Sequence, residues 1–160
     1  MTHNIQIREF HREDLDTIVA LIHQVVEISY KDVYPEGALK LYKEFHSREN
    51  ILHDAENGYC VLAEDNGRII GTGTLLDDGI RRVYIDPSYQ NNGIGKGIYR
   101  ELENKALQTG LSRLGLGASV VAREFWESVG FVFEEEMDIP AGGEQLKFYM
   151  MSKLLSGTGG

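Results

Sequence analysis

A polar, glycine-containing turn is the part of this sequence best suited to binding a ligand. It reads Gln90-Asn91-Asn92-Gly93-Ile94-Gly95-Lys96, and it follows an apolar segment that ends in Asp86-Pro87. Glycines at 93 and 95 leave backbone N–H groups unshielded, and the helix expected after the turn adds a positive partial charge at its start. A pyrophosphate is the natural ligand of such a turn. Taken alone, the pattern also fits a purely structural turn between a strand and a helix.

Two common phosphate-binding motifs do not fit this turn. A Walker loop needs a glycine five residues before its Gly-Lys pair and a hydroxyl residue after it, but Gln90 and Gly97 stand at those positions. The dinucleotide fingerprint needs a third glycine where Ile98 stands, and an acidic residue about twenty positions further on. The segment found there, 113–117, carries no carboxylate. Both motifs are therefore excluded.

The segment 83–97 resembles motif A of the GCN5-related N-acetyltransferase family, whose core is Gln/Arg-x-x-Gly-x-Gly/Ala after a strand ending in Asp-Pro. Gln90, Gly93 and Gly95 match that core position for position. A second segment, 118–131, resembles the family's motif B, written Asn/Ser-x-x-Ala-x-x-Phe/Leu-Tyr-x-x-x-Gly-Phe. The two matches occur in the family's order and at its spacing, so together they are far more specific than either alone.

The resemblance implies acetyl-CoA as co-substrate and assigns contacts to it. One strand would bond the pantetheine amides and polarise the thioester carbonyl, and the turn would present N–H groups to the pyrophosphate. The cofactor-binding residues so implied are Val83, Tyr84, Ile85, Gln90, Asn91, Asn92, Gly93, Ile94, Gly95, Lys96, Ser119 and Trp126. Ser119 also fits an ordinary helix cap. Four basic residues are candidates for binding the outer phosphate of the cofactor, and each also fits a solvated surface charge: Arg81, Arg82, Lys96 and Arg100.

The acid and base that many relatives use are both absent. Trp126 replaces the tyrosine of motif B, and an indole N–H donates a hydrogen bond but is no acid near neutral pH. Gly115 replaces a glutamate found on the preceding strand in some relatives. We predict Tyr149, on the last expected strand, as the substitute acid, with Tyr84 as the alternative. The candidate bases are Glu64 and Asp65. Either would act through water, but both also fit surface charges at a hairpin turn.

The function implied is transfer of an acetyl group from acetyl-CoA to a primary amine, by direct attack in a ternary complex. The missing acid and base favour an alternative, an acyl-CoA-binding regulatory protein with little or no turnover. The acceptor would lie against the N-terminal half of the chain, whose aromatic residues fit either a pocket wall or a hydrophobic core: Tyr30, Tyr34, Tyr42 and His46.

The elements that position these residues follow from periodicity and turn chemistry. Apolar residues at helical spacing, caps and alternating runs predict a mixed α/β domain with one central sheet. The resemblance adds that this sheet is twisted, mostly antiparallel, flanked by helices, and carries a parallel strand pair at the cofactor cleft. Strands are expected at 5–8, 59–64, 68–76, 80–85, 114–117, 131–138 and 145–154, and helices at 15–26, after Pro35, after Ser47, and at 93–108 and 120–129.

Composition bounds the remaining possibilities. The 160 residues suit a single domain over 1–155, with an apolar-free tail at 156–160 that we expect to be disordered. A net charge of −9 argues against nucleic acid, and it either serves solubility or favours an amine-bearing substrate. The five histidines have no metal-ligand spacing, and the apolar runs are too short for a membrane span. Cys60, read as a core thiol, fits a cytoplasmic location, and the resemblance allows a homodimer.

Overall fold

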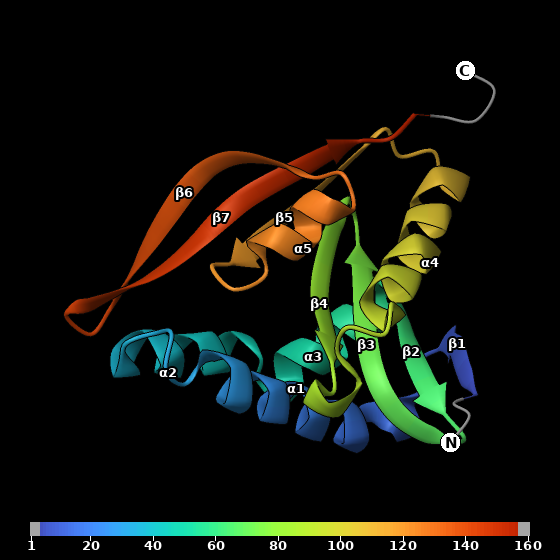
Figure 1. Cartoon of the computed structure of the whole chain (residues 1–160), viewed down its shortest axis with the longest axis horizontal. Coiled ribbons are helices and arrows are strands. Elements are labelled where there is room, and N and C mark those ends of the chain that lie inside the picture. The colour runs from blue at the N-terminus through green and yellow to red at the C-terminus, as the bar shows by residue number, and fades with distance from the viewer. Residues whose placement is uncertain (1–3, 157–160) are drawn as a thin grey trace.

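The computed structural model describes residues 4–156 as one seven-stranded sheet with helices against both faces (Figure 1). The strand order is β1-β2-β3-β4-β5-β7-β6, and every neighbouring pair is antiparallel except β4 and β5. The strands are β1 Ile5–Glu9, β2 Tyr59–Asp65, β3 Arg68–Leu76, β4 Gly79–Ile85, β5 Arg113–Ser119, β6 Val132–Ala141 and β7 Glu144–Leu154. The helices are α1 Leu15–Tyr30, α2 Glu36–Phe45, α3 Arg48–Asn57, α4 Ile94–Gln108 and α5 Arg123–Ser128. The predicted fold class is confirmed; the predicted tail, 157–160, lies outside the described residues.

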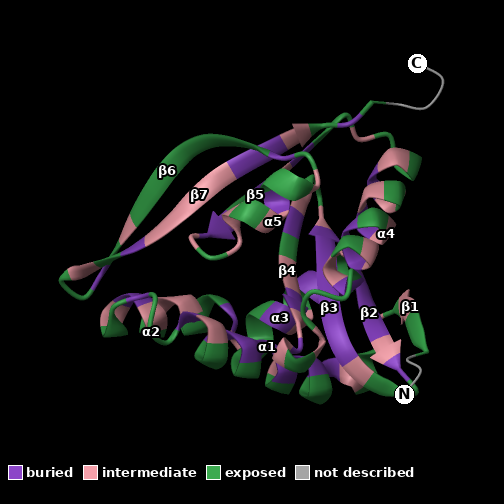
Figure 2. Ribbon diagram, viewed as in Figure 1, coloured by how far each residue is buried: buried purple, intermediate pink, exposed green. Residues whose placement is uncertain are grey.

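Two apolar layers hold the helices against the sheet. One layer packs α4 on the sheet through Ile98 and Leu102, and the other packs α1–α3 on the opposite face through residues such as Ile22. Val61 and Leu62 are neighbours on β2, yet each is fully buried in a different layer, because successive strand residues point to opposite faces. The central strands are therefore covered on both sides (Figure 2). No helix among residues 4–156 combines the length and apolar content needed to span a bilayer.

Local signals in the sequence placed several boundaries correctly. Asn66 and Gly67, between the strands expected at 59–64 and 68–76, both have positive φ, at 50° and 86°, which is the conformation of a type I′ turn. Ser47 caps α3 as predicted, since its side chain accepts a hydrogen bond from the Asn50 backbone N–H at 3.2 Å.

The helix predicted at 120–129 is shorter than expected. Ser119 is still in β5, opposite Phe148, and its Oγ accepts the Ala122 N–H at 3.2 Å to close a turn. The helix α5 begins only after that turn, at Arg123. The intervening Val120 and Val121 are β-branched, and such side chains lose rotamer freedom in a helix. The prediction therefore overextended this helix at its N-terminal end.

The β4 and β5 strands diverge, and this divergence creates the site. Among the described residues their parallel ladder is limited to the pair Gly79 and Gly115, while β5 pairs with β7 along its whole length. A bulge in β4 adds to the divergence, because Arg82 has a φ of 54° where the β3–β4 register shifts. The backbone of Val83–Ile85 consequently faces an opening on its β5 side instead of a neighbouring strand.

Candidate functional site

The opening between β4 and β5 leads into a cavity of about 570 Å³, which we call the turn cavity because the turn 90–96 closes one end of it. Nearly all of the residues that the sequence assigns to the cofactor line this cavity. These are Val83, Tyr84, Ile85, Gln90, Asn91, Gly93, Ile94, Gly95, Lys96 and Trp126. Two assigned residues do not line it: Asn92 is exposed on the turn, and Ser119 lies on the other side of the site.

The turn presents backbone N–H groups to this cavity. Gly93 is the N-cap of α4 and has a φ of 77°, a left-handed conformation that a side chain rarely adopts. The first N–H groups of α4, from Ile94 onward, have no acceptor within their own helix. Gln90 ties the turn to β4 because its Nε2 donates to the Ile85 carbonyl at 3.3 Å. The result is a fixed cluster of donors at the positive end of a fifteen-residue helix, which suits a phosphate group.

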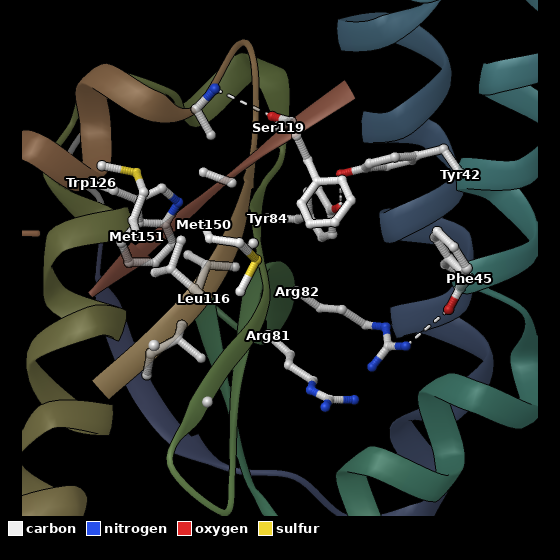
Figure 3. Close-up of a pocket in the computed structure, with 18 of the residues that line it drawn as sticks. Tyr42, Phe45, Arg81, Arg82, Tyr84, Leu116, Ser119, Trp126, Met150 and Met151 are labelled. Carbon is white, nitrogen blue, oxygen red and sulfur yellow. Dashed lines mark hydrogen bonds between the residues drawn. The ribbon is translucent and has the colours of Figure 1, made fainter. Parts of the chain in front are cut away.

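A second cavity, of about 650 Å³, lies on the side of α1 and α2, and we call it the aromatic cavity. Strands β4, β5 and β7 form its floor, and rings from α1 and α2 stand against it (Figure 3). Five residues line both cavities: Tyr30, Val83, Tyr84, Ala122 and Trp126. The two cavities therefore share a wall, and a molecule in one would meet a molecule in the other there.

A chain of hydrogen bonds ends at the hydroxyl of Tyr84, in that shared wall. Asp54 forms an ion pair with Arg82, and Arg82 Nε donates to His46 Nδ1 at 3.0 Å. Because Nδ1 accepts, the proton of the neutral imidazole lies on Nε2, which donates to the Tyr84 oxygen at 2.9 Å. The Tyr84 hydroxyl also contacts the Tyr42 hydroxyl at 2.6 Å. None of these partners is a sequence neighbour of Tyr84 except Arg82.

This hydrogen-bond network is uncharged at the end that reaches the cavity. Burial, followed by the nearby Arg82 charge, lowers the pKa of His46 to about 3, so the imidazole is neutral near physiological pH. Burial also raises the pKa of Tyr84 far above its usual value, and that of Tyr42 as well. Tyr84 therefore stays protonated and offers the cavity a hydrogen-bond donor. Neither His46 nor Tyr84 gains or loses a proton near neutral pH.

Ser119 belongs to the aromatic cavity and has two hydrogen bonds. Its Oγ donates to the Tyr30 hydroxyl at 3.0 Å and accepts the Ala122 N–H, so it does act as a cap of the turn before α5. The Tyr34 hydroxyl accepts the Val120 N–H at 3.2 Å and donates to the Lys147 carbonyl at 3.0 Å. The aromatic residues of the N-terminal half thus fix the position of the β5–α5 turn and also wall the cavity.

The structure does not bring Tyr149, the predicted acid, to either cavity. Its ring packs against Phe133, with centroids 5.7 Å apart, and the Arg123 guanidinium lies 5.0 Å from its centroid. Neither candidate base lines a cavity: Glu64 pairs with Arg8, and Asp65 accepts a hydrogen bond at 2.7 Å from the hydroxyl of Tyr89, which does line the turn cavity. The alternative acid, Tyr84, is the one that reaches the site.

The basic candidates separate in the same way. Lys96 lines the turn cavity, whereas Arg81 and Arg82 line the aromatic cavity, and Arg100 lines neither. Sequence reasoning missed Val25 and Ser29, which line the turn cavity from α1 and belong to no motif, and it named Tyr30 only for the acceptor pocket or the core. Their spacing of four and five residues on one helix face was the available signal, but it equally predicts a core stripe.

Across residues 4–156 no cluster of three metal-binding side chains occurs.

Comparison with known proteins gives consistent results. The model of the acetyltransferase (GNAT) family matches residues 20–131. The chain is 25% identical over 146 residues to spermidine N(1)-acetyltransferase of Thermoplasma acidophilum, covering 81% of this chain and 84% of that protein. A GCN5-related N-acetyltransferase from Rhodopseudomonas palustris has a TM-score of 0.86 at 23% identity, over 97% of this chain and 99% of that one. PaiA N-acetyltransferase from Thermoplasma acidophilum, solved in complex with coenzyme A, has a TM-score of 0.76 at 22% identity, over 95% and 99%.

Proposed function

The chain belongs to the acetyltransferase (GNAT) family and is an acetyl-CoA-dependent N-acetyltransferase, and we propose that it transfers the acetyl group to a primary amine by direct attack within a ternary complex. The observation that carries this proposal is the wall shared by the two cavities. A donor in the turn cavity and an acceptor in the aromatic cavity would meet beside Tyr84 and Trp126. The relative that acts on spermidine, an amine, supports the choice of acceptor chemistry.

The turn cavity fits coenzyme A in its donor set. The N–H groups at the start of α4 would hold the pyrophosphate, and Lys96 adds a positive charge beside them. The backbone of Val83–Ile85, which has no β5 partner, would bond the amides of the pantetheine arm. Phe125 and Trp126 supply an apolar wall opposite that backbone. When bound, acetyl-CoA supplies the activated thioester; the protein supplies its position.

Direct attack needs no nucleophile from the protein. The amine nitrogen forms a bond to the carbonyl carbon and the carbon–sulfur bond breaks. The proton that the nitrogen loses passes, directly or through water, to the leaving thiolate, which departs as the free thiol. Holding both reactants at one wall contributes roughly 7 kcal/mol or more of barrier lowering in well-oriented systems. Such positioning fits a site whose hydroxyl and imidazole groups are buried and neutral.

Initial-rate kinetics test this mechanism. With acetyl-CoA and an accepted amine both varied, double-reciprocal lines should intersect, and each turnover should release one free thiol. Parallel lines, together with an acetylated protein trapped before amine addition, would contradict direct attack. Tight cofactor binding with no thiol release across a broad amine panel would instead favour the regulatory protein that Trp126 and Gly115 suggest.

Cys60 offers a specific check on the absence of a covalent intermediate. Its thiol lines neither cavity, burial raises its pKa, and its Sγ lies 3.6 Å from the Thr72 hydroxyl. Cys60→Ala should therefore leave kcat within about twofold while lowering the free energy of unfolding by about 1 kcal/mol. Steady-state rates and thermal unfolding measure the two effects. Loss of activity in a variant that melts normally would show that the thiol participates.

A further inference from the structure

Two arginines at the aromatic cavity share one carboxylate. Arg82 is almost fully buried: it pairs with Asp54, contacts His46, and donates to the Phe45 carbonyl at 2.9 Å. Arg81 has a single contact with the same Asp54, at 3.2 Å, and its side chain is 52% exposed. Figure 3 shows the two guanidiniums extending side by side from β4. The Asp54 carboxylate therefore neutralises mainly the buried Arg82, and the charge of Arg81 is only partly compensated.

The other charged groups that line this cavity do not change that result. Arg113 and Glu134 compensate each other at 2.7 Å, and Glu134 also accepts a hydrogen bond from Ser152. Asp78 is exposed and has no ion pair within 4.0 Å in the part of the chain that the structure describes. With Asp54 included, three arginines stand against three acids around the cavity, so the uncompensated positive charge is local to Arg81 and Arg82, which share that one carboxylate.

We propose that the acceptor amine carries an anionic group, a carboxylate or a phosphate, that binds Arg81; this rests on the proposed transfer to an amine. Arg81 and Tyr84 are three residues apart on β4, but the bulge at Arg82 places them opposite Thr74 and Thr72 of β3, so they lie roughly 7 Å apart along the strand. An exposed guanidinium pairs well with a carboxylate or phosphate, through two parallel N–H donors. Leu146, Phe148 and Met150 give the cavity an apolar floor, while Arg82 and His46 of its lining are occupied by their own hydrogen bonds. The acceptor is thus an amine joined by a short apolar linker to an anion.

Matched amines test the proposal by binding and by turnover. The probes are 6-aminohexanoate, hexylamine, O-phosphoethanolamine and spermidine, titrated calorimetrically into the CoA-saturated protein and then assayed with acetyl-CoA. We expect 6-aminohexanoate or phosphoethanolamine to bind about tenfold more tightly than hexylamine, and the stronger of the two identifies the anion. Arg81→Gln should abolish that difference and leave hexylamine unaffected, and Arg81→Glu should reverse it in favour of spermidine. Arg48→Gln is the control, because Arg48 is an exposed arginine that pairs with Asp16 and does not line the cavity.

The outcomes separate the two proposals. Preferential binding of an anionic amine without thiol release would support the anionic acceptor and contradict the proposed transfer. Tighter binding of spermidine or hexylamine by the unmodified protein overturns the inference, as does an equal response of Arg81→Gln and Arg48→Gln. Equal affinity for all four amines overturns it too, since Arg81 then contributes nothing to selection.

Discussion

Gly93→Val and Gly95→Val are expected to abolish acetyl-CoA binding, with a loss of more than about 100-fold in affinity. At position 93 the backbone φ of 77° costs an ordinary residue about 1–2 kcal/mol, and more for a β-branched one. A valine there also shields the N–H groups that would face the pyrophosphate. At position 95 a Cβ would lie 3.1 Å from the ring of Phe125, which must shift to accommodate it, and both residues line the turn cavity. Both variants act on the one feature that supplies the anion site.

Isothermal titration with acetyl-CoA measures this effect, and Gly110→Val is its matched control. Gly110 lies just past the opposite end of α4, has a φ of 84°, and has open space where a Cβ would stand. Its replacement introduces the same backbone strain in the same helix without touching the turn. The midpoint temperature of thermal unfolding should fall similarly for Gly93→Val and Gly110→Val, whereas only Gly93→Val should lose acetyl-CoA binding. Normal affinity in both turn variants would remove the turn from the cofactor site.

The parts of the site that the sequence predicted are those specified by local chemistry. The turn 90–96 is recognisable because glycines, polar residues and a following helix occur within a few positions, and the Asn66-Gly67 hairpin is predictable for the same reason. The network at Tyr84 is different. Its partners His46 and Asp54 are 38 and 30 residues away, on the segment around α2 and α3, and only packing of those helices on β4 brings them within hydrogen-bonding distance.

The position of Tyr149 outside both cavities has an equally specific cause. From Phe148 to Met151, β7 carries four large and mainly apolar residues in succession, so alternation does not reveal which face lines a cavity. Phe148 and Met150 face the aromatic cavity, and Tyr149, between them, packs against the layer under α4. Which of these side chains reach a cavity depends on the pairing of β7 with β5, which no local pattern encodes.

Tyr84→Phe is expected to lower kcat by about 100-fold with little change in affinity for acetyl-CoA. The Tyr84 oxygen accepts the His46 Nε2–H and can also accept from Tyr42, so its own proton is free to point into the shared wall. There it can donate to the oxygen or sulfur on which negative charge develops, and loss of one such donor typically costs 10²- to 10³-fold. Tyr99→Phe is the control, because Tyr99 is a buried tyrosine whose hydroxyl donates to Glu103 and lines neither cavity.

The pH dependence distinguishes this donor role from proton transfer. Burial keeps the His46 pKa near 3 and the Tyr84 pKa far above its usual range, so neither group changes its charge between about pH 5 and pH 9. The rate should therefore rise steadily with pH as the acceptor amine, with an ordinary pKa of about 10, loses its proton. Tyr84→Phe should lower the whole profile without altering its shape. A profile whose inflection disappears or moves in Tyr84→Phe, but not in Tyr99→Phe, would instead show that the Tyr84 proton itself is transferred.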